Sequence, residues 1–572
     1  MQKARWTILA MLAALVVAIV ALGGAALAQQ EGTTVSPSAT AQTQGSAQQL
    51  RVDKPGSGNP GPLSATQKLA MKQGYLVPDQ DAYERAKAGA QRLAGGGGNT
   101  TYAAAQGADP ETFRSWEGIR DPRPAPSDST GAIGPTRYIE LINIRYAIYD
   151  RTSNHPINTG TLNDLVGEPP PPPSGEKEGV LVGDPQIIWD PTTRRFYYVA
   201  LDVYSAIDNR LAFGFSKTAS PSSAADFCKY VIKFGPRLPD YPKMGDTKDL
   251  LLIGANTFLA SITHGLGLYL GSDLVSITKP SAGSGCPRRS EFTVDIERKL
   301  REAAGGRAWT PVPANQIDPA EGGYVAAASP DAFLGEGFAR SLSVYEVSSG
   351  ADGSLKLGGP KRLKVPFYSV PATAPQPRSN YRIDTLDGRI TQAILAKDPS
   401  RGGKVALWTQ HTVLGGSGAE VRWYEIDPTT KPSLFQKGTI SGPNGLYAFN
   451  GAISPDRQVN GGTSRFGANM VVGFNTSSTE QRPDIRMVAK QGSAPVSDHV
   501  LIKSSPAVLE DHSCFAFPWC RWGDYSAATP DPVVPGGANT GRVWLTNQWV
   551  RAKGEPNKRP SKWGTWNWAA RP

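Results

Sequence analysis

Short runs of alternating apolar and polar residues, separated by turns, recur along this chain. The clearest example is residues 183–201, GDPQIIWDPTTRRFYYVAL. It predicts a hairpin in which a strand over 185–189 enters the turn at 190–193 and an aromatic-rich strand over 195–201 returns. Proline presets φ at the second turn position, and the aspartate before it can accept hydrogen bonds from the turn backbone. Related segments begin near residues 131, 241, 323, 388, 451 and 523.

Seven units of this kind predict a repeat architecture in which no unit buries its apolar face alone. Their spacing of about 60 residues accommodates four short strands with turns, so we predict an all-β fold, a seven-bladed β-propeller over residues 109–572. Closing the ring removes exposed sheet edges. We therefore expect a C-terminal strand near 565–568 to pair within the blade begun by the N-terminal segment. Within the propeller, residues 291–304 (EFTVDIERKLREAA) have a helical pattern.

The N-terminus carries an export signal. Lys3 and Arg5 precede an apolar run over 6–22, and Ala-Leu-Ala at 26–28 fits a cleavage site. We predict that residues 1–28 are a signal peptide removed on secretion, with an uncleaved membrane anchor as the alternative.

Residues 29–108 differ in composition from the repeats. The part over 29–65 is rich in Gln, Ser, Thr, Gly and Pro and predicts a disordered, low-complexity linker. Residues 66–93 carry Ala and Leu at near-helical spacing, and GGGGN at 95–99 ends the pattern. We expect one or two short helices, loosely attached, of the kind found in a propeptide or a cell-wall spacer.

Composition and charge narrow the class of partner. The chain has 62 Gly and 48 Pro in 572 residues, which is typical of many turns and short strands. The formal net charge of +10 falls to +8 without Lys3 and Arg5, and no Lys/Arg-rich block stands out. We therefore expect no nucleic-acid partner. After the signal peptide, no stretch has the roughly 18 apolar residues of a membrane span, and we expect an extracellular monomer.

Four cysteines in an exported chain predict two disulfides. Cys514 and Cys520 enclose only FAFPW and are the best local pair, which leaves Cys228 and Cys286 for the second. The sequence alone permits three connectivities.

Several longer motifs follow one another along residues 121–568: GAIGPTRYIELIN, GDPQIIWDPTTRRFYY, DYPKMG, DGRITQA, WTQHTV, VRWYEID and RWGDYSAATPDP. Together they resemble a group of secreted bacterial propeller proteins that are sialidase-like in architecture and largely lack an assigned activity. The resemblance implies the fold. The chain contains no Asp box of the S-x-D-x-G-x-x-W kind, no P-loop, no G-x-S-x-G, no H-E-x-x-H and no EF-hand loop. The loop HSCFAFPWC departs from the group and would reshape a rim.

Charged residues at predicted strand ends are the candidate chemistry. Aspartates beside glycine recur before or at strand starts: Asp184, Asp246, Asp387 and Asp524. Equivalent points of successive blades meet around the axis, so these carboxylates would ring the channel mouth and bind sugar hydroxyls or a structural cation such as calcium, or act as acid and base. The alternative is that each caps its own turn. Basic residues at strand ends would bind an acidic sugar or pair with the aspartates: Lys243, Arg389, Arg422 and Arg521.

Two further residues are expected at the rim. His411 follows the strand KVALWTQ, although a hydrogen-bonded structural histidine is the alternative. Trp522, with Trp519, lies beside the cysteine loop and would offer a stacking platform for a sugar ring. The predicted function is therefore a secreted propeller that binds an extracellular glycan or another cell-surface component at the channel mouth. The alternative is a glycan-active hydrolase or lyase that uses paired aspartates.

Overall fold

The computed structural model describes residues 47–54, 76–95, 107–169, 181–205, 207–260, 267–334, 337–443, 445–460, 463–532, 540–551 and 562–572. All of them belong to one compact unit, residues 47–572. The predicted signal peptide and most of the predicted linker lie outside the described residues.

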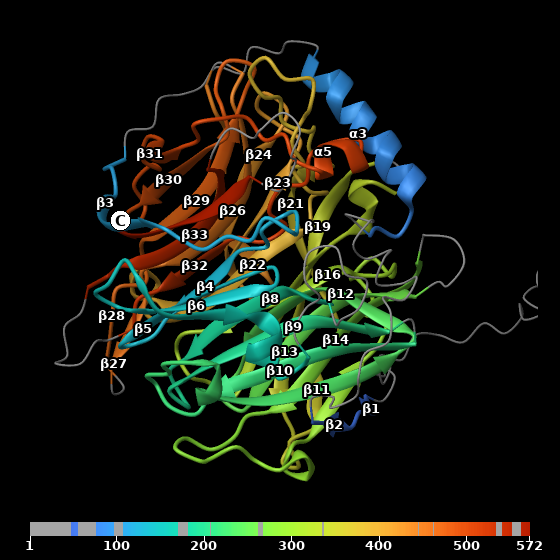
Figure 1. The fold of residues 1–572 in the computed structure, drawn as a ribbon, viewed down its shortest axis with the longest axis vertical. Helices are drawn as coiled ribbons and strands as arrows, with labels where there is room; N and C mark the ends of the chain where they lie inside the picture. Colours follow the sequence, from blue (N-terminus) through green and yellow to red (C-terminus); the bar gives the residue numbers. More distant parts are fainter. Residues whose placement is uncertain are drawn as a thin grey trace, which may run out of the picture. The chain divides into compact units, whose positions relative to one another are not determined.

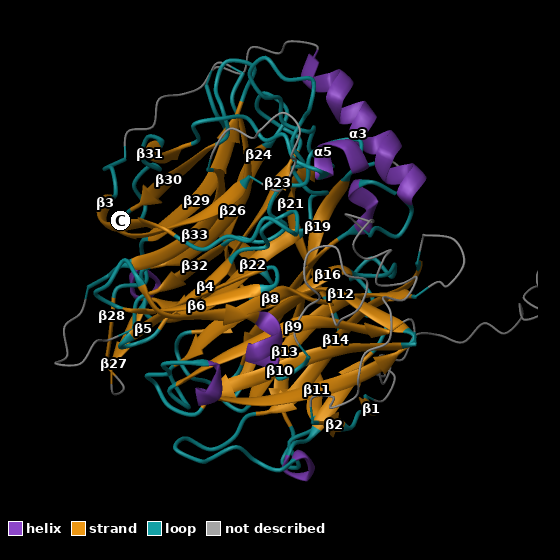
Figure 2. Cartoon of the chain, viewed as in Figure 1, coloured by secondary structure: helices purple, strands orange, loops and turns teal. Residues whose placement is uncertain are grey.

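Strands dominate this unit (Figures 1 and 2). Seven antiparallel sheets form the blades of a β-propeller, which confirms the predicted fold. Blades 1 to 3 are β4 (Thr130–Ile133), β5 (Arg137–Ile142), β6 (Arg145–Asp150) and β7 (Pro156–Thr161); β8 (Leu181–Asp190), β9 (Arg195–Ser205), β10 (Asp208–Ser216) and β11 (Phe227–Gly235); and β12 (Arg237–Asp246), β13 (Leu250–Leu259), β14 (Leu268–Thr278) and β15 (Val294–Glu297).

The remaining four blades follow the same order from the inside of the ring outward. They are β16 (Trp309–Pro313), β18 (Gly322–Ala328), β19 (Ala339–Ser349) and β21 (Lys361–Tyr368); β22 (Ile390–Asp398), β23 (Lys404–Val413), β24 (Glu420–Asp427) and β25 (Ser433–Ile440); β26 (Tyr447–Pro455), β29 (Met470–Ser477), β30 (Asp484–Lys490) and β31 (Val500–Ser504); and β32 (Ala527–Pro530), β33 (Val543–Val550), β34 (Trp563–Arg571) and β3 (Glu111–Glu117).

The first strands of the blades form a closed ring. Strand β4 contacts β8, and contacts continue through β12, β16, β22, β26 and β32 back to β4. These seven strands are therefore the innermost ones, and they line the central channel.

The ring closes through the N-terminal strand β3, which is the outer strand of the last blade. It pairs antiparallel with β34, with Trp116 opposite Asn567. The two chain ends do meet, as predicted. The N-terminal strand joins the C-terminal blade, however, because the first blade already has four consecutive strands of its own.

Shorter elements add to this frame. Strand β1 (Gln48–Gln49) pairs with β15 and β2 (Val52–Asp53) with β11, within the segment predicted to be a disordered linker. Other additions are β17 (Asn315–Gln316) on β22, β20 (Leu355–Leu357) on β19, and the hairpin β27 (Gln458–Asn460) with β28 (Thr463–Arg465). In the described part of the chain, the α-helices are α3 (Gln80–Gly95), α4 (Leu162–Val166) and α5 (Ser513–Ala516), and short 3-10 turns are η2 (Ala224–Asp226), η3 (Arg289–Glu291), η4 (Pro330–Ala332) and η5 (Pro399–Arg401).

The structure tests two helix predictions. Helix α3 falls in the stretch predicted to be helical. The helix predicted over 291–304 is wrong, because Val294–Glu297 forms β15 instead. That strand completes the outer edge of blade 3, and its V-D-I-E alternation has the period of a strand.

Most of the predicted repeats begin at innermost strands. The exception is the unit predicted from residue 323, which begins at the second strand β18, because blade 4 starts at β16. The predicted turn chemistry is present: Asp190 accepts hydrogen bonds from the backbone N–H groups of Thr192 (2.9 Å) and Thr193 (3.1 Å).

The apolar core lies in layers between neighbouring blades. Trp189, Phe196 and Tyr198 pack into the layer between blades 1 and 2. Tyr197 and Val199, which alternate with them on β9, pack into the layer between blades 2 and 3. Successive side chains of a strand point to opposite faces, so each aromatic strand supplies two layers and holds adjacent blades together.

Both predicted disulfides are present. Cys228–Cys286 joins β11 to the loop before β15 and so links blades 2 and 3. Cys514–Cys520 closes the loop that connects blades 6 and 7.

Candidate functional site

Charged residues gather where the innermost strands begin. Those strands run in the same direction along the channel, so their starts meet at one end of it. We call the following nine residues the mouth cluster: Asp128, Asp184, Asp240, Lys243, Asp384, Asp387, Arg389, Arg521 and Asp524. Most are buried, whereas Asp184 and Asp240 keep partial exposure.

The backbone is strained at this end of the channel. Six blades place a non-glycine residue with positive φ in the first half of the inner strand or shortly before it: Asp128 (48°), Asp184 (49°), Tyr241 (55°), Thr310 (51°), Leu386 (63°) and Asn450 (51°). In four blades the strand register also shifts there, which is the mark of a β-bulge. Such a conformation costs of order 1–3 kcal/mol and persists at binding and catalytic sites. Its repetition around one end marks that end as the candidate site.

Hydrogen bonds connect blades 1, 2 and 7 across the mouth. Asn143 donates its amide N–H to Asp128 Oδ2 (2.6 Å) and accepts the backbone N–H of Asp184 (2.9 Å). The backbone N–H of Asp524 binds Asp128 Oδ1 (3.1 Å). The Tyr525 hydroxyl donates to Asp184 Oδ2 (3.1 Å). Three aspartates from three blades thus share one network, Asp128 and Asp184 through their carboxylates and Asp524 through its backbone N–H.

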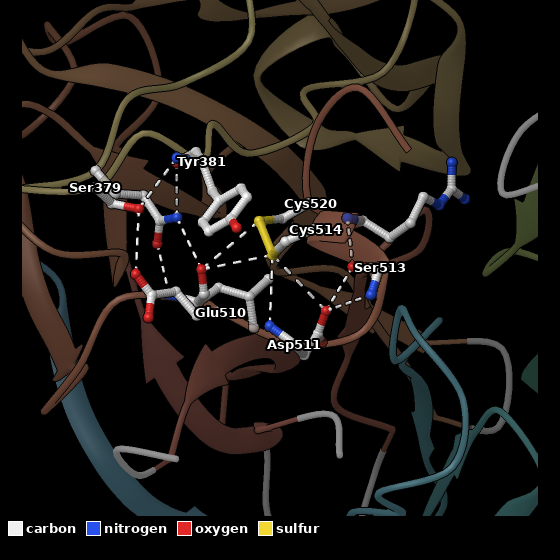
Figure 3. The surroundings of a disulfide bond; sticks show 10 residues. Ser379, Tyr381, Glu510, Asp511, Ser513, Cys514 and Cys520 are labelled. Atoms are coloured by element: carbon white, nitrogen blue, oxygen red, sulfur yellow. Dashed lines mark hydrogen bonds between the residues drawn. A yellow bond between two sulfur atoms is a disulfide. The ribbon is translucent and has the colours of Figure 1, made fainter. Parts of the chain in front are cut away.

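Arg521 is held in the mouth by the short disulfide loop. Its guanidinium contacts Asp384 (3.4 Å) and forms an ion pair with Asp524. Figure 3 shows the neighbouring groups: Asp511 accepts the hydroxyl of Ser513 (2.6 Å), and Ser513 in turn accepts the backbone N–H of Arg521 (2.9 Å). The backbone N–H of Asp384 also binds the carbonyl of Cys520 (2.9 Å). The loop therefore fixes Arg521 beside its two carboxylates.

Asp387 and Arg389 form a second ion pair. The guanidinium donates twice, from Nε (2.9 Å) and Nη2 (3.0 Å), and the indole N–H of Trp309 reaches Asp387 Oδ2 (2.8 Å). Burial raises the pKa of Asp387, but the charge and hydrogen bonds of Arg389 outweigh it and the pKa lies below its usual value. Asp387 is thus ionised and committed to Arg389.

Lys243 has a different environment. Its ammonium lies 3.6 Å from the ring centroid of Tyr525 and 4.2 Å from that of Tyr241. Among the described residues, its Nζ has no hydrogen-bond partner. Burial, followed by the charge of Arg389, lowers its pKa well below the usual value. Lys243 also lines a small cavity in the channel, with room for one or two water molecules.

The mouth cluster has more acid than base, with six carboxylates against three cations. Burial raises the pKa of Asp524 to about 7 and of Asp240 to about 8, and neighbouring aspartates contribute to both. Burial and then the charges of Asp524 and Asp184 raise the pKa of Asp128 well above its usual value. Like charges that share a buried site disfavour ionisation. The mouth can therefore hold protons near neutral pH and would gain from a cationic group.

Of the ten predicted site residues, six are in the mouth cluster: Asp184, Asp387, Asp524, Lys243, Arg389 and Arg521. Asp246 lies six residues beyond Asp240 on β12, about 20 Å at a strand's usual rise. There it forms a salt bridge with Lys279 (2.7 Å), which also pairs with Asp190 (3.0 Å). Asp246 is thus a strut between blades at the other end of the inner strand.

The other three are not at an open rim. Arg422 lies on β24, the third strand of its blade, and pairs with Glu420 (2.8 Å). His411 is fully buried, its ring nitrogens 2.9 Å from the carbonyl of Gly388 and 3.0 Å from the Tyr424 hydroxyl. Trp522 is buried too, and its indole N–H donates to Asn475 (2.9 Å). The expectation of an exposed stacking platform at Trp522 is wrong.

Sequence patterns did not single out Asp128, Asp240 and Asp384, nor Tyr241 and Tyr525. Asp128 and Asp240 lack an adjacent glycine, which was the signal used. Tyr241 and Tyr525 do lie in the motifs DYPKMG and GDYS at two strand starts. That shared D-Y step could have identified both tyrosines and Asp240.

The described residues contain neither a metal-binding group nor a membrane-spanning helix. No three His, Cys, Asp or Glu side chains there are grouped to hold a metal ion, and the calcium site stays a prediction. Within the same residues, no helix has the length and apolar character to cross a membrane.

No protein-family model matches this chain, and no curated protein matches it in sequence. Solved structures do match it, with low identities and low TM-scores. A GH62 hydrolase in complex with xylotriose is 11% identical, covers 57% of this chain and 90% of its own, and has a TM-score of 0.27. An alpha-L-arabinofuranosidase of Clostridium thermocellum is 12% identical, covers 54% and 82%, and has a TM-score of 0.27. Drosophila Semaphorin 1a is 8% identical, covers 80% and 88%, and has a TM-score of 0.37. At such TM-scores, only the site itself can support a function.

Proposed function

We propose that this chain is a secreted β-propeller that binds an extracellular glycan at the mouth cluster. The observation that carries the proposal is the strained ring of inner-strand starts, which brings nine charged residues to one end of the channel. Structural ion pairs alone do not need a left-handed Thr310 or Tyr241, conformations that are costly for β-branched or bulky residues.

The chemistry of the mouth suits a polyhydroxylated ligand. Sugar hydroxyls can donate to the partly exposed carboxylates of Asp184 and Asp240. Asp524 Oδ1 is buried and has no hydrogen-bond partner among the described residues, so it too can accept a donor. The tyrosine rings at 241 and 525 lie 4.7 Å apart beside these carboxylates. Buried unpaired polar atoms are costly, and a ligand hydroxyl would satisfy them.

Secretion is part of the same proposal. Two disulfides are present in the structure, and disulfides persist in oxidising compartments. The predicted signal peptide agrees with export.

A glycan-active enzyme is the second candidate, favoured by one observation. Asp524 and Asp240 have pKa values of about 7 and about 8. A carboxyl group that keeps its proton near neutral pH can act as a general acid toward a leaving group, with an ionised carboxylate as its partner.

The test compares two aspartates of the same strand β12. Asp240→Asn should abolish retention of the polysaccharide that the wild type binds. Asp246→Asn is the matched control: it weakens the salt bridge to Lys279 at the other end of the strand and should leave retention unchanged. A panel of immobilised polysaccharides, read for protein retention and for new reducing ends, separates the binding protein from the enzyme. The proposal fails if no polysaccharide retains the wild type, or if both variants bind like the wild type.

A further inference from the structure

Helix α3 presents a lysine in the middle of its buried stripe. Its fully buried positions are Tyr83, Lys87 and Ala90, at the i, i+4 and i+7 spacing of one helix face. Lysine is almost never fully buried unless it is paired, yet Lys87 is only 3% exposed. The helix was expected to be loosely attached, and instead it delivers an ammonium into the propeller.

Lys87 contacts the mouth cluster at Asp384. Its Nζ donates to the hydroxyl of Thr385 (3.0 Å) and lies 3.7 Å from Asp384 Oδ1. The ring of Trp519 is 5.9 Å away, within the range of a cation–π contact. In Figure 1, α3 lies beside α5, and Ala90 packs in the same apolar cluster as Cys514 and Cys520 of that loop.

The ammonium site is built by the propeller and not by the helix. Asp384 Oδ1 accepts the backbone N–H groups of Thr385 (2.8 Å) and Leu386 (3.1 Å), and its Oδ2 contacts Arg521. Thr385 donates its own hydroxyl to the carbonyl of Ala372 (3.0 Å), which leaves the oxygen lone pairs for Lys87. These contacts lie within the propeller, so the acceptors remain in place when Lys87 is absent.

Tyr83 adds a ring next to the ammonium. It packs edge-on against Phe333 (6.0 Å between centroids) and Trp519 (6.1 Å). Burial, followed by the charges of Asp384 and Asp387, raises the pKa of its hydroxyl well above the usual value, so this group lies near the carboxylates as a neutral phenol. Tyr83 and Lys87 together present a six-membered ring and a primary ammonium to an aromatic wall and a carboxylate.

We propose that the Asp384–Thr385 site binds the ammonium of an amino sugar, with Trp519 and Phe333 against the sugar ring, and that Tyr83 and Lys87 of α3 occupy this site when the ligand is absent. The proposal rests on the glycan-binding function proposed above and names the sugar class. The contacts of Asp384 support it: its Oδ1 lies 3.7 Å from the Lys87 ammonium, and the ammonium of a ligand would replace the positive charge that leaves with Lys87.

The test uses the full chain and three soluble oligosaccharides of equal length: a glucosamine hexamer, its N-acetylated counterpart and a cellohexaose. Tyr83→Ala/Lys87→Ala empties the site. The matched control is Glu84→Ala/Arg85→Ala, because both residues are on the exposed face of the same helix. Calorimetry measures binding, and denaturant midpoints verify that each variant is folded.

An apparent dissociation constant is the intrinsic one divided by the fraction of molecules whose site is open. If α3 covers the site in more than nine molecules of ten, the emptied variant should bind the glucosamine hexamer at least tenfold tighter than the wild type does. The control double variant should bind like the wild type. Adding Thr385→Val to the emptied variant, which removes the hydroxyl acceptor and is milder than a change at Asp384, should reduce that gain.

Two results would overturn the inference, and they have different meanings. If the glucosamine and N-acetylglucosamine hexamers bind the emptied variant equally, or if emptying gives no gain, the amino-sugar site is wrong while glycan binding stands. If no oligosaccharide binds any variant and no polysaccharide retains the wild type, the proposed function fails and this inference fails with it.

Discussion

The two disulfides should have different roles, one mainly in the stability of the fold and the other mainly in the geometry of the site. Cys228–Cys286 links blades 2 and 3 through two cysteines that are far apart in the sequence, whereas Cys514–Cys520 closes a short loop next to Arg521. Two double variants test these roles: Cys228→Ala/Cys286→Ala removes the long bridge, and Cys514→Ala/Cys520→Ala removes the short one.

The magnitudes follow from the loops that the bridges close. A crosslink reduces the entropy of the unfolded chain by an amount that grows with the logarithm of loop length. The sequence separation is 58 residues for Cys228–Cys286 and 6 for Cys514–Cys520. At 25 °C these correspond to about 4 and about 2 kcal/mol of unfolding free energy.

Loss of the short bridge should affect glycan binding more than loss of the long bridge. Without the short bridge, the loop over 511–520 loses the constraint that sets Ser513 against the backbone N–H of Arg521. Arg521 then holds Asp384 and Asp524 less firmly, and glycan retention should fall at least tenfold. The long bridge anchors β11 on the outer side of blade 2, whereas the mouth cluster lies at the inner strands, so its loss should leave retention unchanged.

Urea unfolding under non-reducing conditions gives the first quantity, and retention on the cognate polysaccharide gives the second. The expected result is a crossover: the variant that loses more stability keeps the ligand, and the variant that loses less stability loses it. Full retention by the Cys514→Ala/Cys520→Ala variant would refute the positioning role of the loop. A larger stability loss from the short bridge than from the long one would refute the loop-length argument.

Three further predictions concern titrating groups. Burial lowers the pKa of Lys87 to about 8, so the free-energy cost of its buried charge is largest below pH 8 and disappears as the pH rises toward 10.5. The Lys87→Met variant should therefore be more stable than the wild type by at most about 3 kcal/mol at pH 7, and by much less at pH 10. A gain in stability that is independent of pH would contradict this. Burial raises the pKa of Asp240 to about 8, so its favourable contribution to folding stability is complete below about pH 4 and is lost as the pH rises through 8. Between pH 5 and 8.5, the urea midpoint should therefore fall more for the wild type than for the Asp240→Asn variant. Parallel curves for the two proteins would disprove the shift. Burial lowers the pKa of His411 to about 3, so its imidazole NMR signals should not move between pH 5 and 8, and a titration midpoint near 6.5 would show that the ring reaches solvent.

The sequence by itself determined what depends on neighbouring residues. The aspartate at 190 caps its own turn whatever the rest of the chain does, and aromatic residues that alternate on β9 must point to two faces. Seven such hairpins were enough to predict the blades and their number. The short disulfide was predictable for the same reason, because only five residues separate its cysteines.

The composition of the mouth was decided by tertiary structure. Asp240 and Asp246 lie six residues apart on one strand. The direction of that strand through the ring places Asp240 in the mouth cluster and Asp246 in a salt bridge between blades at the other end. The sequence of helix α3 did not show where the helix docks either, because the partners of its buried lysine, Asp384 and Thr385, lie some 300 residues away in the chain. Local patterns fix turns and faces through short-range geometry. Which charges meet depends on closure of the whole ring, where distant blades impose burial and pairing that no local sequence encodes.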